Sequence, residues 1–173
     1  PDLAKTIKKI MGEGHKGFYT GNFAKKMVES VQKNGGIWSE EDLNRYQVLE
    51  REPVRSTYNG VSIIAPGLPS SGGLVLSNAL NILSGFDLDK FSTTIRKHLI
   101  IEALRRAYYE RAIKMGDPDF MHESLEFLLS PSFAAKQRES ININYATDNK
   151  VLEFAEPPYK GKGNDTTHFA VID

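Results

Sequence analysis

The sequence changes from helical to strand periodicity at one place, and this change sets the fold class. Residues 54–58 (VRSTY) and 61–65 (VSIIA) are short stretches with the β-branched and aromatic side chains that strands favour. Asn59 and Gly60 between them favour a type I′ turn, because both central residues of that turn need positive φ. The pattern predicts a β-hairpin near 54–65 in an otherwise helix-rich chain, and hence an α+β fold.

Apolar residues at helical spacing predict the helices around this hairpin. Their expected ranges are 3–11, 23–31, 42–46, 72–83, 92–114, 125–129 and 132–138. Ser39, with Asp42 three residues later, resembles a capping box for the third of them. In the longest, Glu102 and Arg106 have the spacing of an i,i+4 ion pair, for which a few tenths of a kcal/mol is expected.

Composition argues against several classes of partner. The 173 residues include 22 basic and 22 acidic side chains, so the formal net charge is zero and no nucleic-acid partner is expected. No run of about 18 apolar residues is present, so no membrane span is expected. The lack of cysteine excludes disulfides, thiolate catalysis and cysteine-ligated zinc. The chain begins without Met and stops at Asp173 within an apparent strand, so we interpret it as a piece of a longer protein.

Five motifs follow one another along the chain. They are GFYTG at 17–21, KNGGIWSEEDLNRYQVLEREPV at 33–54, PSSGG at 69–73, LNIL at 80–83 and ERAIKMGDPDF at 110–120. The strand-like stretch TTHFAVID follows at 166–173, after a region rich in Pro and Gly. In this order the motifs resemble the γ-glutamyltranspeptidase family, whose large subunit ends in such a run and whose small subunit starts at a TTH-like threonine. The family usually has aspartate where Glu110 stands.

This resemblance implies the αββα sandwich of the N-terminal-nucleophile hydrolases. Residues 1–165 would be the C-terminal part of the large subunit, with an exposed linker at about 142–165, and residues 166–173 the first strand of the small subunit. We expect one incomplete domain, completed by the remainder of the same precursor. A periplasmic or extracellular location is implied as well. Because the terminal strand would have a free backbone edge, we expect the isolated piece to form a homodimer.

The chemistry implied by the resemblance depends on Thr166. A threonine hydroxyl needs a base, and an N-terminal threonine carries one in its own α-amine, with a reference pKa of about 8. Before cleavage that nitrogen is a planar amide and cannot act as a base. The resemblance implies self-cleavage between Asp165 and Thr166. The freed threonine would then transfer the γ-glutamyl group of glutathione to water or an amino acid through an ester.

Other candidate residues are given structural roles. Strand alternation places His168 on the same face as Thr166 and Thr167 on the opposite face, yet the α-amine makes a histidine base unnecessary. The four histidines have no metal-ligand spacing, so neither a metal nor a cofactor is expected.

The motifs themselves are interpreted as structural. PSSGG could form an anion-binding turn, but a serine N-cap followed by close-packed glycines is favoured. GDPD at 116–119 has too few carboxylates for calcium and is interpreted as a turn. GFYTG is interpreted as a packing turn, and Trp38 as a core residue.

Three alternatives remain open from the sequence. The chain could belong to a cephalosporin acylase-like enzyme or to one that cleaves poly-γ-glutamate, with the same processing site and another substrate. It could also be a non-catalytic helical scaffold whose threonine is never released. By the resemblance, the carboxylate-binding arginine and the oxyanion donors lie outside residues 1–173. The isolated piece is therefore expected to be inactive, because each missing donor costs about 10² to 10³ in rate.

Overall fold

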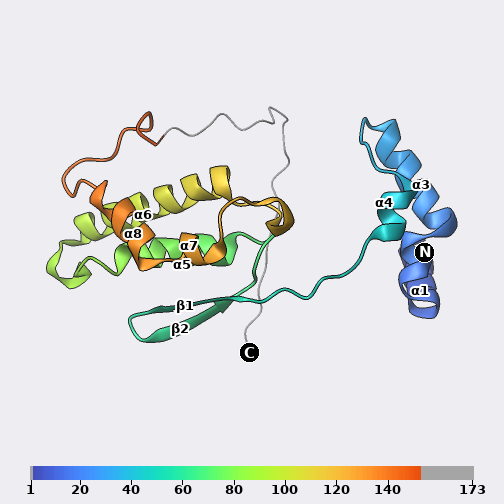
Figure 1. Ribbon diagram of the computed structural model, residues 1–173, viewed down its shortest axis with the longest axis horizontal. Helices are drawn as coiled ribbons and strands as arrows, with labels where there is room; N and C mark the ends of the chain where they lie inside the picture. Colours follow the sequence, from blue (N-terminus) through green and yellow to red (C-terminus); the bar gives the residue numbers. More distant parts are fainter. Residues whose placement is uncertain (1, 153–173) are drawn as a thin grey trace. The chain divides into compact units, whose positions relative to one another are not determined.

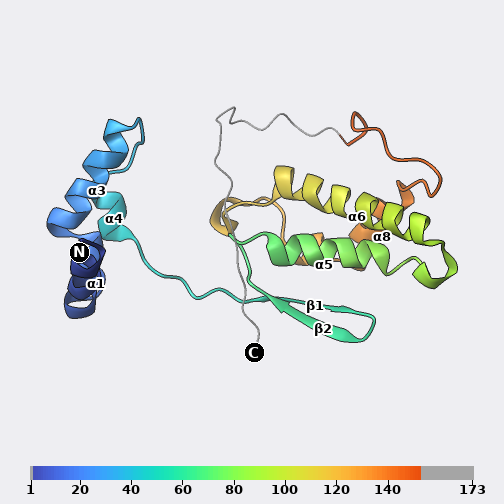
Figure 2. The ribbon, with the colours of Figure 1, turned by 180° about the vertical axis from the view of Figure 1, so that it is seen from behind.

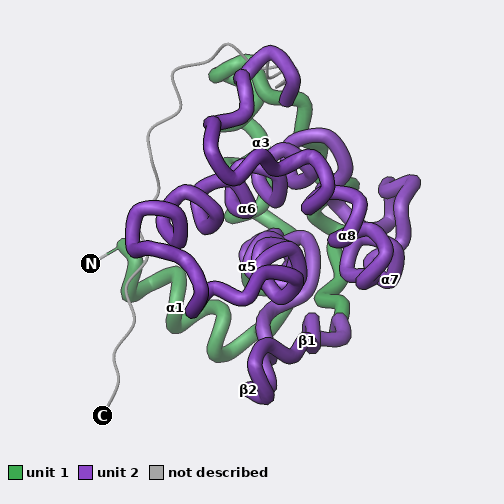
Figure 3. Tube along the Cα trace, turned by 90° about the vertical axis from the view of Figure 1, so that its left-hand side faces the viewer, with its two compact units in different colours: residues 1–50 green, residues 51–173 purple. Residues whose placement is uncertain are grey.

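The computed structural model describes residues 2–152 and divides into two compact units, residues 1–50 and 51–173 (Figure 3). The first unit contains α1 (Asp2–Glu13), α2 (His15–Tyr19), α3 (Gly21–Lys33) and α4 (Glu40–Arg45). The second contains β1 (Val54–Tyr58), β2 (Val61–Ala65), α5 (Gly72–Leu83), η1 (Leu88–Lys90), α6 (Thr93–Lys114), η2 (Pro118–Phe120), α7 (Leu125–Leu128) and α8 (Pro131–Glu139) (Figure 1). The fold class is α+β, as the sequence indicated.

The first unit is built around a small core of Ala24, Val28 and Leu43. The expected capping box begins α4: the Ser39 hydroxyl accepts a hydrogen bond from the Asp42 amide at 3.2 Å. In return, the Asp42 carboxylate accepts one from the Ser39 amide at 2.7 Å. The hydrogen bond from the Ser39 side chain is the main cause that lowers the pKa of Asp42.

Two expectations for the first unit are wrong. Of residues 17–21, expected as a turn, residues 17–19 lie in helix α2 and only Thr20 lies between α2 and α3. Gly17 allows α2 to contact α1, since a Cβ on Gly17 would lie 2.8 Å from the Lys9 carbonyl oxygen. The aromatic contacts expected there do form, with the rings of Tyr19 and Tyr46 stacked at 4.9 Å. Trp38 is 46% exposed rather than buried.

The predicted hairpin forms with the predicted turn. Strands β1 and β2 are antiparallel, and Tyr58 pairs with Val61 across Asn59 and Gly60. Both turn residues have positive φ, 47° and 79°, as a type I′ turn requires. Val54 is the buried end of the hairpin. The turn therefore sets the register of the two strands, and burial of Val54 decides which face of the hairpin packs against the rest of the unit.

Helix α5 is the central element of the second unit. It contacts α6, α8 and both strands, and it lies between α6 and the hairpin in two opposite views (Figures 1 and 2). The core formed by these helices consists of Val75, Ala79, Ile82, Leu83, Leu99, Ala103, Ala107 and Ala134. Ser92 caps α6, accepting a hydrogen bond from the Ile95 amide at 3.4 Å. The predicted positions of α5, α6, α7 and α8 are thus confirmed.

Candidate functional site

The predicted nucleophile and its cleavage partner lie outside the described residues. Asp165, Thr166, Thr167 and His168 all follow residue 152, and their assignments stay predictions, as does the domain boundary at 165. The structure does describe the motif-bearing residues of the second unit and the beginning of the chain that leads to Thr166. Their contacts define the candidate site.

The PSSGG motif completes the connection from β2 to α5 and supplies the first two residues of α5, Gly72 and Gly73. A Cβ on Gly73 would lie 2.6 Å from the Ala65 Cβ and 2.9 Å from the Pro66 carbonyl oxygen, so the helix can start this close to the strand only with glycine. Gly72 has open space around it. The close-packing role predicted for the glycines is therefore confirmed for Gly73 alone.

Ser71 does not cap α5 as expected. It occupies the N-cap position, but its backbone is in the α region and its hydroxyl makes no capping hydrogen bond. Instead the hydroxyl accepts a hydrogen bond from the Arg111 Nε at 2.8 Å. The reason is tertiary: α6 brings Arg111, from the fifth motif, against the third motif.

A second contact joins the fifth motif to the end of the second. The Arg51 guanidinium lies 3.3 Å from the Asp119 carboxylate and 3.8 Å from that of Asp117. Asp117 also accepts a hydrogen bond from the Asp119 amide at 3.1 Å, which confirms the predicted turn. The sequence indicated no partner for these carboxylates.

A small cavity lies at the Ser71–Arg111 contact. It has a volume of about 260 Å³ and is lined by Pro69, Ser71, Arg111, Ala112, Met115 and Gly116. Residues from PSSGG and from ERAIKMGDPDF thus lie at one place, although about 40 residues separate them in sequence. Within residues 2–152, no three His, Asp or Glu side chains converge as metal ligands. No helix in this part of the chain is both long and apolar enough to cross a membrane.

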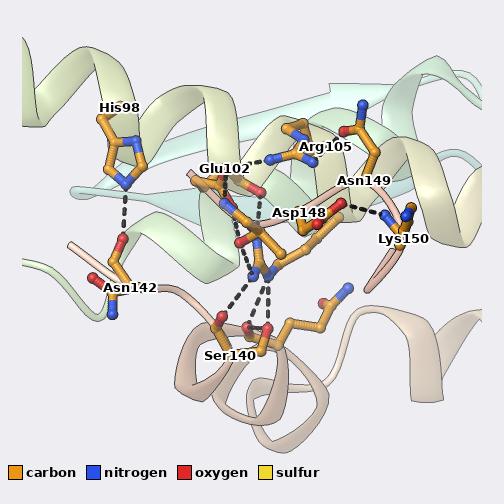
Figure 4. Close-up of polar contacts among 11 residues, drawn as sticks. His98, Glu102, Arg105, Ser140, Asn142, Asp148, Asn149 and Lys150 are labelled. Carbon is orange, nitrogen blue, oxygen red and sulfur yellow. Dashed lines mark hydrogen bonds and ion pairs between the residues drawn. The ribbon is translucent and has the colours of Figure 1, made fainter. Parts of the chain in front are cut away.

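A second group of α6 side chains, Glu102, Arg105 and Arg106, forms a buried ionic network (Figure 4). Glu102 is 1% exposed and Arg106 is 2% exposed, and the Arg106 Nη1 donates to the Glu102 carboxylate at 2.6 Å. Arg105 donates to the same carboxylate at 2.5 Å. Thr147 donates to it through its hydroxyl at 2.5 Å and through its amide at 3.3 Å. The predicted i,i+4 pair therefore forms, but it is buried and has many more partners than an exposed pair.

The hydrogen bonds decide the charge state of Glu102. Burial alone would raise its pKa, but hydrogen bonds from Thr147, Arg106 and Arg105 outweigh burial and lower the pKa to about 2. The carboxylate is therefore ionised at neutral pH. The expected few tenths of a kcal/mol applies to pairs in water, whereas this pair is buried and the desolvation of both charges enters its energy.

Arg106 extends the network to residues 140–152, which we call the approach segment because it leads toward Thr166. Its guanidinium donates to the Ser140 carbonyl at 2.7 Å and to the Ser140 hydroxyl at 2.8 Å. His98 donates to the Asn142 carbonyl at 2.8 Å, and Arg105 donates to the Asn149 side chain at 2.6 Å (Figure 4). The described part of the predicted linker is therefore attached to α6.

Sequence reasoning missed the role of the approach segment. Thr147 and Asn149 stand in a polar stretch without periodicity, and such a stretch gives no indication of a buried partner. The only available signal was the i,i+4 spacing of Glu102 and Arg106. That spacing cannot show that the α6 face is covered by residues about 40 positions later in the chain.

Known proteins resemble this chain over nearly its whole length. The sequence matches the family Gamma-glutamyltranspeptidase over residues 1–173. It is 37% identical to the glutathione hydrolase proenzyme of Pseudomonas sp. (strain A14) over 174 residues, covering 99% of this chain and 30% of that protein. This chain thus spans about 30% of the length of that curated relative.

Solved structures are also similar to this chain. The crystal structure of Helicobacter pylori gamma-glutamyltranspeptidase matches with a TM-score of 0.76 and 35% identity, covering 94% of this chain and 47% of that one. The cephalosporin acylase from Bacillus halodurans matches with a TM-score of 0.71 and 31% identity, covering 80% of this chain and 26% of that one. The fold is therefore the α+β arrangement shared by these transpeptidases and an acylase. The chain belongs to the gamma-glutamyltranspeptidase family.

Proposed function

We propose that this chain is part of a proenzyme that cleaves itself between Asp165 and Thr166 and then acts on γ-glutamyl amides such as glutathione. The observation that carries the proposal is the family match over residues 1–173, which includes the predicted cleavage site. A relative named as a glutathione hydrolase proenzyme, 37% identical, supports the substrate and the precursor form. The proposed location is periplasmic or extracellular, on the same resemblance.

The proposed self-cleavage needs only groups of the chain and one water. The Thr166 hydroxyl attacks the Asp165 carbonyl carbon, the C–N bond breaks, and the nitrogen takes a proton to become a free amine. Water then hydrolyses the resulting ester, which leaves a carboxylate on Asp165 and the free hydroxyl on Thr166. General-base catalysis by the new amine is worth about 10² to 10⁴ in rate.

In the processed enzyme, the Thr166 amine would take the proton from its own hydroxyl as the oxygen attacks the γ-carbonyl carbon of glutathione. The amide C–N bond breaks, and the leaving amine of Cys-Gly takes the proton. A γ-glutamyl ester on Thr166 remains. Water hydrolyses it to glutamate, or an amino acid takes the acyl group on its amine.

The experiment is intact mass measurement and N-terminal sequencing of the full-length protein. We expect a new amino terminus at Thr166, together with release of glutamate from glutathione. Thr166→Ala should abolish cleavage and activity together, whereas Thr167→Ala, on the opposite face of the expected strand, should retain cleavage. If Thr166→Ala still cleaves and still releases glutamate, the proposal is wrong.

A related acylase activity is the second candidate. The similarity to the Bacillus halodurans cephalosporin acylase, at a TM-score of 0.71, favours it specifically. Both activities would use the same threonine ester, so processing cannot distinguish them. Comparing kcat/KM for glutathione and for an N-acyl cephalosporin on the processed protein would decide between them.

A further inference from the structure

Helix α6 has an unusual distribution of charged and apolar side chains. Leu99, Ala103 and Ala107 lie in the core of the second unit and are 0% exposed. On one flank of this core row, the buried side chains are charged: Glu102, Arg106 and Glu110. Three of the charges that would normally face water on such a helix are therefore inside the protein.

The other flank of the core row is apolar and exposed. Each residue turns an α-helix by about 100°, so Ile100, Leu104 and Tyr108 form a second row beside the first. Ile101 adjoins this row, because it is three residues from Leu104. We call these four residues the outer face; their exposed fractions are 39%, 37%, 53% and 55% for Ile100, Leu104, Tyr108 and Ile101.

The outer face is too large and too apolar for an ordinary solvated helix surface. It extends over about 12 Å of helix axis, at 1.5 Å per residue from position 100 to position 108. Single exposed apolar side chains are common on protein surfaces, but neighbouring ones on one helix face mark an interaction site. A helix that is apolar on more than one face is normally packed on more than one face.

Basic side chains at both ends of the outer face restrict what can bind it. Lys97 and Arg111 are exposed, and each is seven residues, about two helical turns, from Leu104. Antiparallel packing of a second copy about Leu104 would place Lys97 of each copy opposite Arg111 of the other. Parallel packing would place each of these residues opposite itself. Both arrangements bring like charges together, so a second copy of this chain fits the outer face poorly.

The similar proteins supply a better occupant. This chain spans 30% of the length of its 37% identical relative from Pseudomonas sp. (strain A14). In the Helicobacter pylori structure, 94% of this chain matches only 47% of that chain. More than half of that solved chain therefore lies outside the shared fold, and this is polypeptide that could cover a face of α6.

We propose that the outer face is a docking surface for another segment of the same polypeptide, one that lies outside residues 1–173. That segment presents apolar side chains to Ile100, Ile101, Leu104 and Tyr108, and acidic or uncharged side chains near the two basic ends. The inference rests on the part of the proposed function that makes this chain a piece of a longer proenzyme. Helix α6 is then packed on two faces, which accounts for its apolar outer face.

Photo-crosslinking in the full-length protein identifies the occupant. Benzoylphenylalanine is placed at position 108, where it replaces one aromatic side chain by another, and the crosslinked peptides are identified by mass spectrometry. We expect crosslinks within one molecule to peptides outside residues 1–173. Crosslinks confined to residues 1–173, or crosslinks that join two molecules into a covalent dimer, would overturn the proposal.

Cysteine labelling measures whether the outer face is covered. Leu104→Cys is compared with Lys136→Cys, an exposed position on α8, in the full-length protein, and each site is followed by peptide mass. Relative to the same protein unfolded in urea, the cysteine at position 104 should react at least about 10-fold more slowly, and the one at position 136 should be slowed much less. Ile101→Cys is the second position on the outer face and should be protected in the same way. Reaction at both outer-face positions as fast as in urea contradicts the proposal.

Failure of this inference and failure of the proposed function give different results. N-terminal sequencing of the same samples reports cleavage at Thr166. A protein that is cut there, but reacts freely at positions 101 and 104, refutes the docking surface alone. A protein that is never cut, but is protected at these positions, refutes self-cleavage and supports the docking surface.

Discussion

Substituting Glu102 by Gln tests how the buried network works. The wild-type carboxylate accepts hydrogen bonds from Arg105, Arg106 and Thr147 inside the protein. Gln has nearly the same shape, but it removes the negative charge and leaves the Arg106 guanidinium buried without its counterion. Removing one partner of a buried ion pair typically costs about 3–5 kcal/mol.

The part of this cost that depends on pH follows from the pKa of Glu102. The fall from 4.5 to about 2 corresponds to roughly 3 kcal/mol, at about 1.36 kcal/mol for each tenfold change in proton affinity. Because the folded-state pKa is lowered, this stabilisation is fully present above pH 4.5 and is lost as the pH falls toward 2. About 40% of it should remain at pH 3.

Hydrogen exchange at the Thr147 amide reports the network directly, since that amide donates to Glu102. In the full-length protein at pH 7, Glu102→Gln should speed this exchange by on the order of 100-fold, after correction for intrinsic rates. The ratio of the exchange rate in the variant to that in the wild type should shrink as the pH falls from 5 to 3. A ratio that stays constant between pH 7 and pH 3 would show that the charge of Glu102 does not hold the approach segment, and would refute the reasoning.

Two local substitutions test the turn before α5 and the start of α4. Gly73→Ala places a Cβ 2.6 Å from Ala65 and should destabilise by about 1–3 kcal/mol, whereas Gly72→Ala meets open space and should leave the melting temperature almost unchanged. Equal melting temperatures for the two variants would contradict the close approach of helix and strand. Ser39→Ala removes the cap of α4 at a cost of about 1 kcal/mol, seen as faster exchange of the Asp42 amide, and Ser39→Thr should restore protection. Unchanged exchange in Ser39→Ala would rule out a stabilising cap.

Elements whose cause is local could be predicted from the sequence. The hairpin follows from Asn59 and Gly60, whose positive φ fixes the turn and thereby the strand pairing. The capping box at Ser39 follows from a hydrogen bond spanning three residues. In both cases the interacting groups are near neighbours in the chain, so their spacing alone specifies the contact.

Expectations failed where packing between elements, and not the local residue pattern, decided the outcome. Residues 17–19 became part of helix α2 because Gly17 lets α2 contact α1, and Ser71 lost its capping role because α6 brings Arg111 to its hydroxyl. For Trp38, hydrophobicity favoured burial, but the small core of the first unit is made by other residues. Residue type gives a preference, and the packed partner decides whether it is realised.

The sequence by itself determined the fold class, the family and the threonine on which the proposed chemistry depends, because motif order and local periodicity are written in consecutive residues. Only the tertiary structure decided that PSSGG and ERAIKMGDPDF meet at Ser71 and Arg111, and that Glu102 and Arg106 are buried beneath the approach segment. A helical period shows which residues share a face. It does not show what covers that face, and burial is what converts an ordinary i,i+4 pair into a network that holds the chain leading to Thr166.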